Sequence, residues 1–203
     1  MNLSVVFYIP NMIDYFRIIL LIVSVFFKGR SFALLYITSI SLDYFDGYAA
    51  RRFGQISLLG GALDMIIDRV STMVILSKIS QEKPSYSPWC ILYSIIDFMS
   101  HFIFFLMSAY TGTHHKKFSD NIFLSLYYRK GFLYFICLGS ELCFILTYLS
   151  RSKKRVFDAQ KSILSFLQLV AATKTFFHIV HFVVGILFMS SIESDYARFN
   201  KSS

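Results

Sequence analysis

Long apolar runs constrain this chain more than any other feature of its sequence. About six largely apolar segments follow one another along the 203 residues, with short polar loops between them. A run of about 18 or more apolar residues is typical of a helix that crosses a bilayer. We therefore expect an all-α polytopic membrane protein with six transmembrane helices, in a single membrane domain that covers residues 1–203. The expected helices span about 10–27, 31–51, 58–79, 87–110, 130–149 and 163–189.

Composition agrees with lipid as the main solvent. The chain is 56% hydrophobic and only 16% charged, whereas about a quarter of the residues in a soluble domain are charged. The first ten residues lack the basic start and the small-residue cleavage site of a removable signal peptide, so we expect the first apolar segment to remain as an anchor. Cys90, Cys137 and Cys143 show no metal-type spacing, and we expect free thiols packed as small apolar groups.

The net charge of +8 points to membrane lipids as partners, with no nucleic acid. The Lys and Arg residues lie mostly in short loops between apolar segments, where anionic headgroups would meet them. Counted by alternate loops, their totals are nearly equal. The positive-inside rule therefore does not orient this chain.

The residues that carry chemistry lie where the second expected helix ends and the third begins. Spacings of three and four place Asp43 and Asp46 on one face of one helix, and Asp64 and Asp68 on one face of the next. A short turn joins the two helices, so the two faces can oppose each other. The stretch reads Asp43-Tyr-Phe-Asp46-Gly47-Tyr-Ala-Ala50-Arg51, then Gly60-Gly-Ala-Leu-Asp64-Met-Ile-Ile-Asp68.

Four converging carboxylates resist ionisation unless a cation compensates them. Oxygen ligands with no His or Cys nearby favour Mg²⁺ or Mn²⁺ over zinc, and such metals commonly bind substrate phosphates, so phosphoryl transfer is the leading reaction class. The small residues Gly47, Ala50 and Gly60 would let a nucleotide or a diphosphate approach the backbone. Arg51 could pair with a phosphate oxygen, and Ser57 in the turn could add a hydroxyl contact.

The stretch from Asp43 to Asp68 resembles the signature of the CDP-alcohol phosphotransferases, D-x2-D-G-x2-A-R-x8-G-x3-D-x3-D, at every fixed position. The resemblance implies that the first three aspartates bind divalent metal and that Asp68 both contributes to the metal site and acts as base. It also implies that the Gly-x2-Ala-Arg segment holds the CDP part of the donor. The acceptor hydroxyl would attack the phosphorus next to diacylglycerol, and CMP would leave.

Within that family, the rest of the chain is similar to eukaryotic-type phosphatidylinositol synthases. This similarity implies CDP-diacylglycerol as donor, myo-inositol as acceptor, a homodimer, and an endoplasmic reticulum membrane with the active site facing the cytosol. The acceptor contacts are left open among Lys116, Arg129 and Lys130. The similar residues are Pro10-Asn11-Met-Ile13 with Arg17, Leu63-Asp-Met-Ile-Ile-Asp-Arg69, Ser71-Thr72, Asp97-x3-His101, His115-Lys116, Tyr127-Tyr128 and Ser140-Glu141-Leu142.

Three other interpretations of the aspartates stay open. The same chemistry with another acceptor (glycerol 3-phosphate, serine or inositol phosphate) also satisfies the signature. A divalent-cation transporter could use the carboxylates as a permeation site. Structural ion pairs with Arg51, Arg52 and Arg69 would explain the acids without any function.

Some charged or polar residues lie in the middle of apolar segments. For His101, His178 and His181 we favour hydrogen-bonded packing over metal ligation. Asp97 lies in a segment where a lone charge costs at least a few kcal/mol. We therefore expect Asp97 to be paired or to line a cavity.

Overall fold

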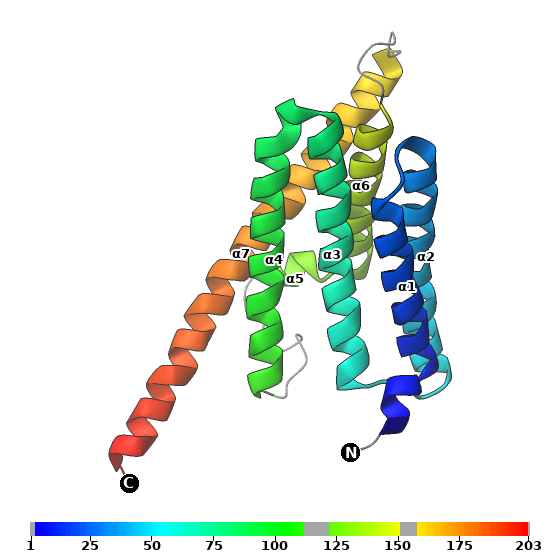
Figure 1. The fold of residues 1–203 in the computed structure, drawn as a ribbon. Coiled ribbons are helices and arrows are strands. Elements are labelled where there is room, and N and C mark those ends of the chain that lie inside the picture. The colour runs from blue at the N-terminus through cyan, green and yellow to red at the C-terminus, as the bar shows by residue number, and fades with distance from the viewer. Residues whose placement is uncertain (1–2, 112–121, 151–157, 203) are drawn as a thin grey trace. The chain divides into compact units, whose positions relative to one another are not determined.

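The computed structural model describes residues 3–111, 122–150 and 158–202, and every regular element in these ranges is helical (Figure 1). This confirms the all-α prediction. Five of the six long helices coincide closely with the expected segments, whereas α7 (Asp158–Ser202) begins five residues before and ends 13 residues after the segment expected at 163–189, and the short α5 was not predicted. The elements are η1 (Leu3–Phe7), α1 (Ile9–Val25), α2 (Gly29–Arg52), α3 (Leu58–Glu82), η2 (Pro84–Tyr86), α4 (Ser87–Thr111), α5 (Ile122–Tyr127), α6 (Lys130–Leu149) and α7 (Asp158–Ser202).

Three helical segments among the described residues are long and apolar enough to cross a membrane: Pro84–Met107, Gly131–Leu149 and Lys161–Ile192. The chain is therefore an integral membrane protein. Helix α1 has 17 residues, and α2 and α3 carry the aspartates and other charged residues within their length. That these three helices also cross the membrane, for a total of six, stays a prediction.

Contacts divide the chain into two compact units that are described separately below. The first unit comprises Met1–Ile91 and Phe144–Lys154, and the second comprises Leu92–Cys143 and Arg155–Ser203. Helices α4 and α6 each contribute to both units. The expectation of a single membrane domain stays a prediction.

In the first unit, α1 packs against both α2 and α3. At the end of α1 the ammonium group of Lys78, from α3, donates to the carbonyl oxygens of Val25 (2.6 Å) and Phe27 (3.0 Å). The last carbonyls of a helix lack partners within it, and a cation is favourable at its C-terminal end. The amide of Gly29 donates to the Tyr148 hydroxyl at 2.7 Å. These bonds tie α1, α2, α3 and the end of α6 together far along α3 from its aspartates.

The turn between α2 and α3 needs a glycine. Gly54 has a φ of +65°, in the left-handed region that glycine adopts readily. The amide of Gln55 donates to the carbonyl of Ala50 at 2.9 Å, which closes a Schellman motif at the end of α2. The Gln55 side chain accepts from the amide of Ile9 at 2.9 Å. The turn thus fixes both the α2–α3 hairpin and the start of α1.

In the second unit, apolar side chains pack α4 and α5–α6 against α7. An added Cβ at Gly185 of α7 would lie 2.7 Å from Ile103 of α4, so glycine permits a close approach there. The ring of His181 places Nδ1 2.7 Å from the Phe177 carbonyl oxygen, which confirms the packing interpretation for this histidine. The two apolar clusters are Phe104 and Met107 with Ile103, Val180, Val184, Phe188 and Met189, and Tyr127, Ile136 and Phe177 with Phe132 and Leu133.

Cys90, Cys137 and Cys143 form no disulfide in this structure. Cys90 and Cys143 are buried, and Cys137 is half-buried. The prediction made from their spacing is confirmed.

Candidate active site

The four signature aspartates come together in the first unit. We call this group the carboxylate cluster: Asp43 and Asp46 from α2, and Asp64 and Asp68 from α3. One carboxylate oxygen from each of Asp43, Asp64 and Asp68 lies within 4.8 Å of the others. The structure thus gathers the predicted metal-binding side chains at the junction of α2 and α3.

A guanidinium group from a third helix joins these carboxylates. Nη1 of Arg17, in α1, lies 2.6 Å from Oδ2 of Asp46 and 3.3 Å from Oδ1 of Asp64. Nη2 lies 2.7 Å from Oδ1 of Asp43 and 2.8 Å from Oδ1 of Asp68. A single side chain therefore contacts all four signature carboxylates.

The site is closed on the side of Arg17 and open on the other. The Arg17 side chain is 1% exposed and Asp46 is 7% exposed, whereas the other three members of the cluster are between 36% and 47% exposed. Asp14, one turn before Arg17, is also buried and places Oδ1 3.0 Å from Nη1. A ligand would meet the cluster from its open side.

The donor set fits a divalent metal. Carboxylate oxygens are the ligands that Mg²⁺ and Mn²⁺ prefer, and the cluster offers no nitrogen or sulfur donor. Arg69 adds a second positive charge, with Nη2 3.7 Å from Oδ2 of Asp68. Two arginines cannot neutralise the four cluster carboxylates and Asp14, and the unbalanced negative charge favours a further cation.

The residues predicted to hold the nucleotide lie beside the carboxylate cluster. Arg51 is exposed, and its guanidinium group folds back over Gly47, where an added Cβ would lie 3.3 Å from Nη1. Ala50, half-buried, lies one residue before it on α2. This end of α2 therefore combines small residues with an accessible positive charge.

Gly60 and Ser57 have structural roles that the sequence did not indicate. An added Cβ at Gly60 would lie 2.9 Å from Oδ1 of Asn11, so glycine lets α1 approach α3. The Ser57 side chain accepts from the Gly60 amide at 3.0 Å and caps the start of α3. Both residues thereby help to place Asp64 and Asp68 in the first turns of α3.

Reasoning from the aspartate motif missed Arg17 and Asp14 as members of this site. They are the only charged residues between 10 and 27, and they are three positions apart. An ionisable residue in an apolar helix is a functional candidate by default. That rule, applied to the first apolar segment, would have singled out this pair.

Three basic residues were left open as acceptor contacts, and two of them lie in or beside α6. Lys116, like the His114–Lys117 and Arg151–Arg155 segments, lies outside the described residues. Lys130 is the first residue of α6. Arg129, just before it, has an exposed side chain.

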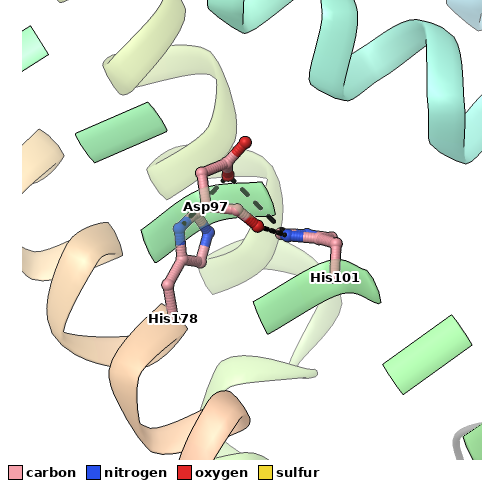
Figure 2. A group of neighbouring side chains, drawn as sticks. All are labelled: Asp97, His101 and His178. Atoms are coloured by element: carbon pink, nitrogen blue, oxygen red, sulfur yellow. Dashed lines mark hydrogen bonds and ion pairs between the residues drawn. The ribbon is translucent and has the colours of Figure 1, made fainter. Parts of the chain in front are cut away.

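A second group of ionisable side chains lies within the second unit (Figure 2). We call it the histidine cluster: Asp97 and His101 from α4, and His178 from α7. Oδ1 of Asp97 lies 3.2 Å from Nδ1 of His178 and 3.7 Å from Nδ1 of His101. The Asp97 side chain is 2% exposed, so the prediction that this carboxylate is paired is confirmed.

By residue type, the histidine cluster could hold a metal ion. However, Nδ1 of His101 also lies 2.8 Å from the backbone carbonyl oxygen of Asp97 and 3.1 Å from Oγ of Ser100. Its ring nitrogen thus takes part in hydrogen bonds within α4. For His101 these contacts agree with the hydrogen-bonded packing interpretation.

The geometry defines a class before any relative is considered: an integral membrane protein with an oxygen-only carboxylate cluster between two helices. The chain belongs to the CDP-alcohol phosphatidyltransferase family, whose model matches residues 7–192.

The relatives share one name. The chain is 35% identical over 149 residues to the CDP-diacylglycerol–inositol 3-phosphatidyltransferase of Drosophila melanogaster, across 72% of this chain and 66% of that protein. It is 39% identical over 150 residues to the Candida albicans protein of that name (70% and 65%) and 33% identical over 153 residues to the Homo sapiens one (72% of each). The match therefore spans about two thirds of the length of the first two relatives. No solved structure matches the chain.

Proposed function

We propose that this protein is a phosphatidylinositol synthase, which transfers the phosphatidyl group of CDP-diacylglycerol to myo-inositol and releases CMP. The observation that carries the proposal is the meeting of all four signature carboxylates at one open site. Family membership supports the reaction type. The names of the relatives support the donor and the acceptor.

The carboxylate cluster would hold the metal. A bound Mg²⁺ or Mn²⁺ would supply charge neutralisation for the diphosphate and for the departing CMP. Asp43, Asp46, Asp64 and Asp68 provide the oxygen ligands. Because three of these side chains reach the open side of the site, a diphosphate can approach them without unpacking the helices.

Asp68 is the proposed general base. Its Oδ1 is held 2.8 Å from Nη2 of Arg17, whereas its Oδ2 lies 3.7 Å from Nη2 of Arg69. Oδ2 can therefore accept the proton of the inositol hydroxyl. The hydroxyl oxygen forms a bond to the phosphorus next to diacylglycerol, and the bond from that phosphorus to CMP breaks. CMP leaves with the bonding electron pair, and the proton remains on Asp68.

The donor nucleotide would lie along the end of α2 and the start of α3. Arg51 is exposed beside Gly47 and can pair with a phosphate oxygen. Ala50 and Gly60 leave room near the backbone, and the hydroxyl of Ser57 can still donate while it accepts the Gly60 amide. Membrane lipids would surround the helices, and the acyl chains of the donor would enter from the bilayer.

The proposal extends to the assembly and its location. We expect a homodimer in the endoplasmic reticulum membrane, with the carboxylate cluster facing the cytosol, where water-soluble inositol and released CMP are exchanged. The likeness to eukaryotic relatives supports this placement. The acceptor would be neutral, so it needs hydroxyl-binding groups more than additional positive charge.

The test is CMP release by the full-length protein in detergent, with CDP-diacylglycerol and Mg²⁺ or Mn²⁺. Myo-inositol, glycerol 3-phosphate, serine and buffer alone are compared as acceptors, with Asp68→Asn as the control variant. We expect release that depends on inositol and is lost in the variant, while donor binding remains.

Two results would contradict the proposal at different levels. Release with another acceptor would keep the chemistry and overturn inositol. No release with any acceptor, from folded protein, would overturn the transferase, and metal flux into vesicles would then test a cation transporter.

A further inference from the structure

Arg17 is built into α1 as the buried neighbour of the carboxylate cluster. Its side chain is 1% exposed, although it carries a permanent charge in a largely apolar helix. The hydroxyl of Ser39, from α2, donates to the backbone carbonyl of Arg17 at 3.1 Å. Asp14 contacts Nη1 at 3.0 Å. The position of the guanidinium group is therefore set from within its own helix and from the next one.

The two guanidinium nitrogens divide the carboxylates in a particular way. Nη1 contacts Asp46 of α2 and Asp64 of α3, and Nη2 contacts Asp43 of α2 and Asp68 of α3. Each nitrogen therefore joins one carboxylate from each helix. A guanidinium group is planar and its donors have fixed directions. Its orientation consequently sets the orientation of four side chains on two helices.

Each carboxylate has two oxygens, and the contacts with Arg17 use one from each. They use Oδ1 of Asp43, Asp64 and Asp68, and Oδ2 of Asp46. The other oxygens are the candidate metal ligands, and that of Asp68, Oδ2, lies 3.7 Å from Nη2 of Arg69. Metal-binding carboxylates are commonly held in this way by an outer partner, whose loss typically lowers metal affinity about tenfold to a hundredfold.

We propose that Arg17 is the positioning residue of the metal site, forming its buried floor and holding one oxygen of each signature carboxylate so that the other oxygens face the divalent cation. The inference deepens the proposed function, because it presumes that these carboxylates bind metal. It assigns Arg17 no contact with the substrate. Its role is to fix ligand geometry, and the charge it supplies is secondary.

This role makes a prediction opposite to that of simple charge compensation. If Arg17 only neutralised the aspartates, its removal would leave more negative charge and Mn²⁺ would bind more tightly. If Arg17 fixes their geometry, Mn²⁺ must bind more weakly even though a positive charge has been lost. Lysine keeps the charge but has one terminal nitrogen, so it cannot join two pairs of carboxylates.

The experiment measures Mn²⁺ binding to the full-length protein in detergent by electron paramagnetic resonance, without lipid substrate. Arg17→Gln and Arg17→Lys are compared with the unchanged protein and with Arg69→Gln, which removes an equal charge from a residue whose Nη2 lies 3.7 Å from Oδ2 of Asp68. Asp64→Asn identifies the signal from the cluster. Thermal unfolding shows which variants are folded.

We expect Mn²⁺ affinity to fall about tenfold or more in Arg17→Gln and Arg17→Lys, and to stay equal or rise slightly in Arg69→Gln. Arg17→Lys is the deciding variant if Arg17→Gln does not fold. Unchanged or tighter binding in a folded Arg17 variant would overturn the inference and leave the proposed function standing. A different outcome would overturn the metal site itself: Mn²⁺ binding to the unchanged protein that is absent, or that persists in Asp64→Asn.

Discussion

The carboxylate cluster and the histidine cluster both hold acidic side chains within helices, but they differ in exposure and in the groups that pair with the carboxylates. Each places at least one carboxylate within a helix, with another acidic or imidazole group one turn away. In the carboxylate cluster, the permanent charge of Arg17 faces oxygens that are partly open to solvent. In the histidine cluster, Asp97 is 2% exposed, and its neighbours are imidazoles (Figure 2).

This difference in exposure and pairing distinguishes a candidate active site, the carboxylate cluster, from a structural element, the histidine cluster. A buried carboxylate is destabilising by several kcal/mol unless it is paired, and the buried carboxylates of both clusters are paired. Only the carboxylate cluster combines unbalanced negative charge with an accessible side, which a phosphate-bound metal requires. Exposure and counter-charge therefore discriminate between them better than spacing along the helix.

The largest predicted effect is on turnover. Asp68→Asn removes the proposed base, and we expect CMP release to fall by a hundredfold to about ten-thousandfold, the usual contribution of a general base. The same assay on His178→Asn should show metal dependence like that of the unchanged protein. Equal losses in the two variants would remove the functional distinction between the clusters.

The histidine cluster should contribute stability instead. Asp97→Asn breaks a buried pair, and we expect the free energy of unfolding to fall by about 3 kcal/mol. Thermal unfolding in detergent measures this change, and Mn²⁺ titration of the folded fraction should give an unchanged affinity. Loss of a bound metal from Asp97→Asn would make the histidine cluster a metal site and break the comparison.

Gly60 offers a matched test of how α1 delivers Arg17. Gly60→Ala brings a Cβ to 2.9 Å from Oδ1 of Asn11, whereas Gly61→Ala meets nothing within 4 Å. We expect Gly60→Ala to destabilise the protein by about 1–3 kcal/mol and to weaken Mn²⁺ binding. Gly61→Ala should be neutral or slightly stabilising, because alanine favours a helix. Identical behaviour of the two variants would show that the α1–α3 approach does not shape the site.

The smallest effect concerns Ser57. Ser57→Ala removes the cap on α3 and should cost about 1 kcal/mol, whereas Ser57→Thr keeps a capping oxygen. Thermal unfolding tests the cap. A raised KM for CDP-diacylglycerol in Ser57→Ala, with little change in Ser57→Thr, would support the proposed donor contact. An unchanged KM in both would limit Ser57 to its structural role.

Local patterns predicted much of the fold. The segments expected at 58–79 and 130–149 correspond to α3 (Leu58–Glu82) and α6 (Lys130–Leu149). They could be predicted because a long helix of this kind is a continuous, largely apolar run in the sequence. Helix α5 has only six residues and lies just before α6. A helix this short has no long apolar run from which it could be predicted. The convergence of Asp43 with Asp64 followed from helical spacing and a short turn.

Pairings between distant segments could not be predicted. Arg17 is 51 residues from Asp68, and Asp97 is paired with His178 of another helix. Spacing along one helix says nothing about which helix lies opposite. For the same reason, Gly60 was taken for a nucleotide contact, although it also faces Asn11 across the α1–α3 interface.

The most direct test of the whole account is mass spectrometry of the lipid made by the purified protein from CDP-diacylglycerol, myo-inositol and Mn²⁺. The account predicts phosphatidylinositol, formed only with the metal and lost in Asp68→Asn. Folded protein that binds Mn²⁺ at the carboxylate cluster but forms no phosphatidylinositol would contradict it.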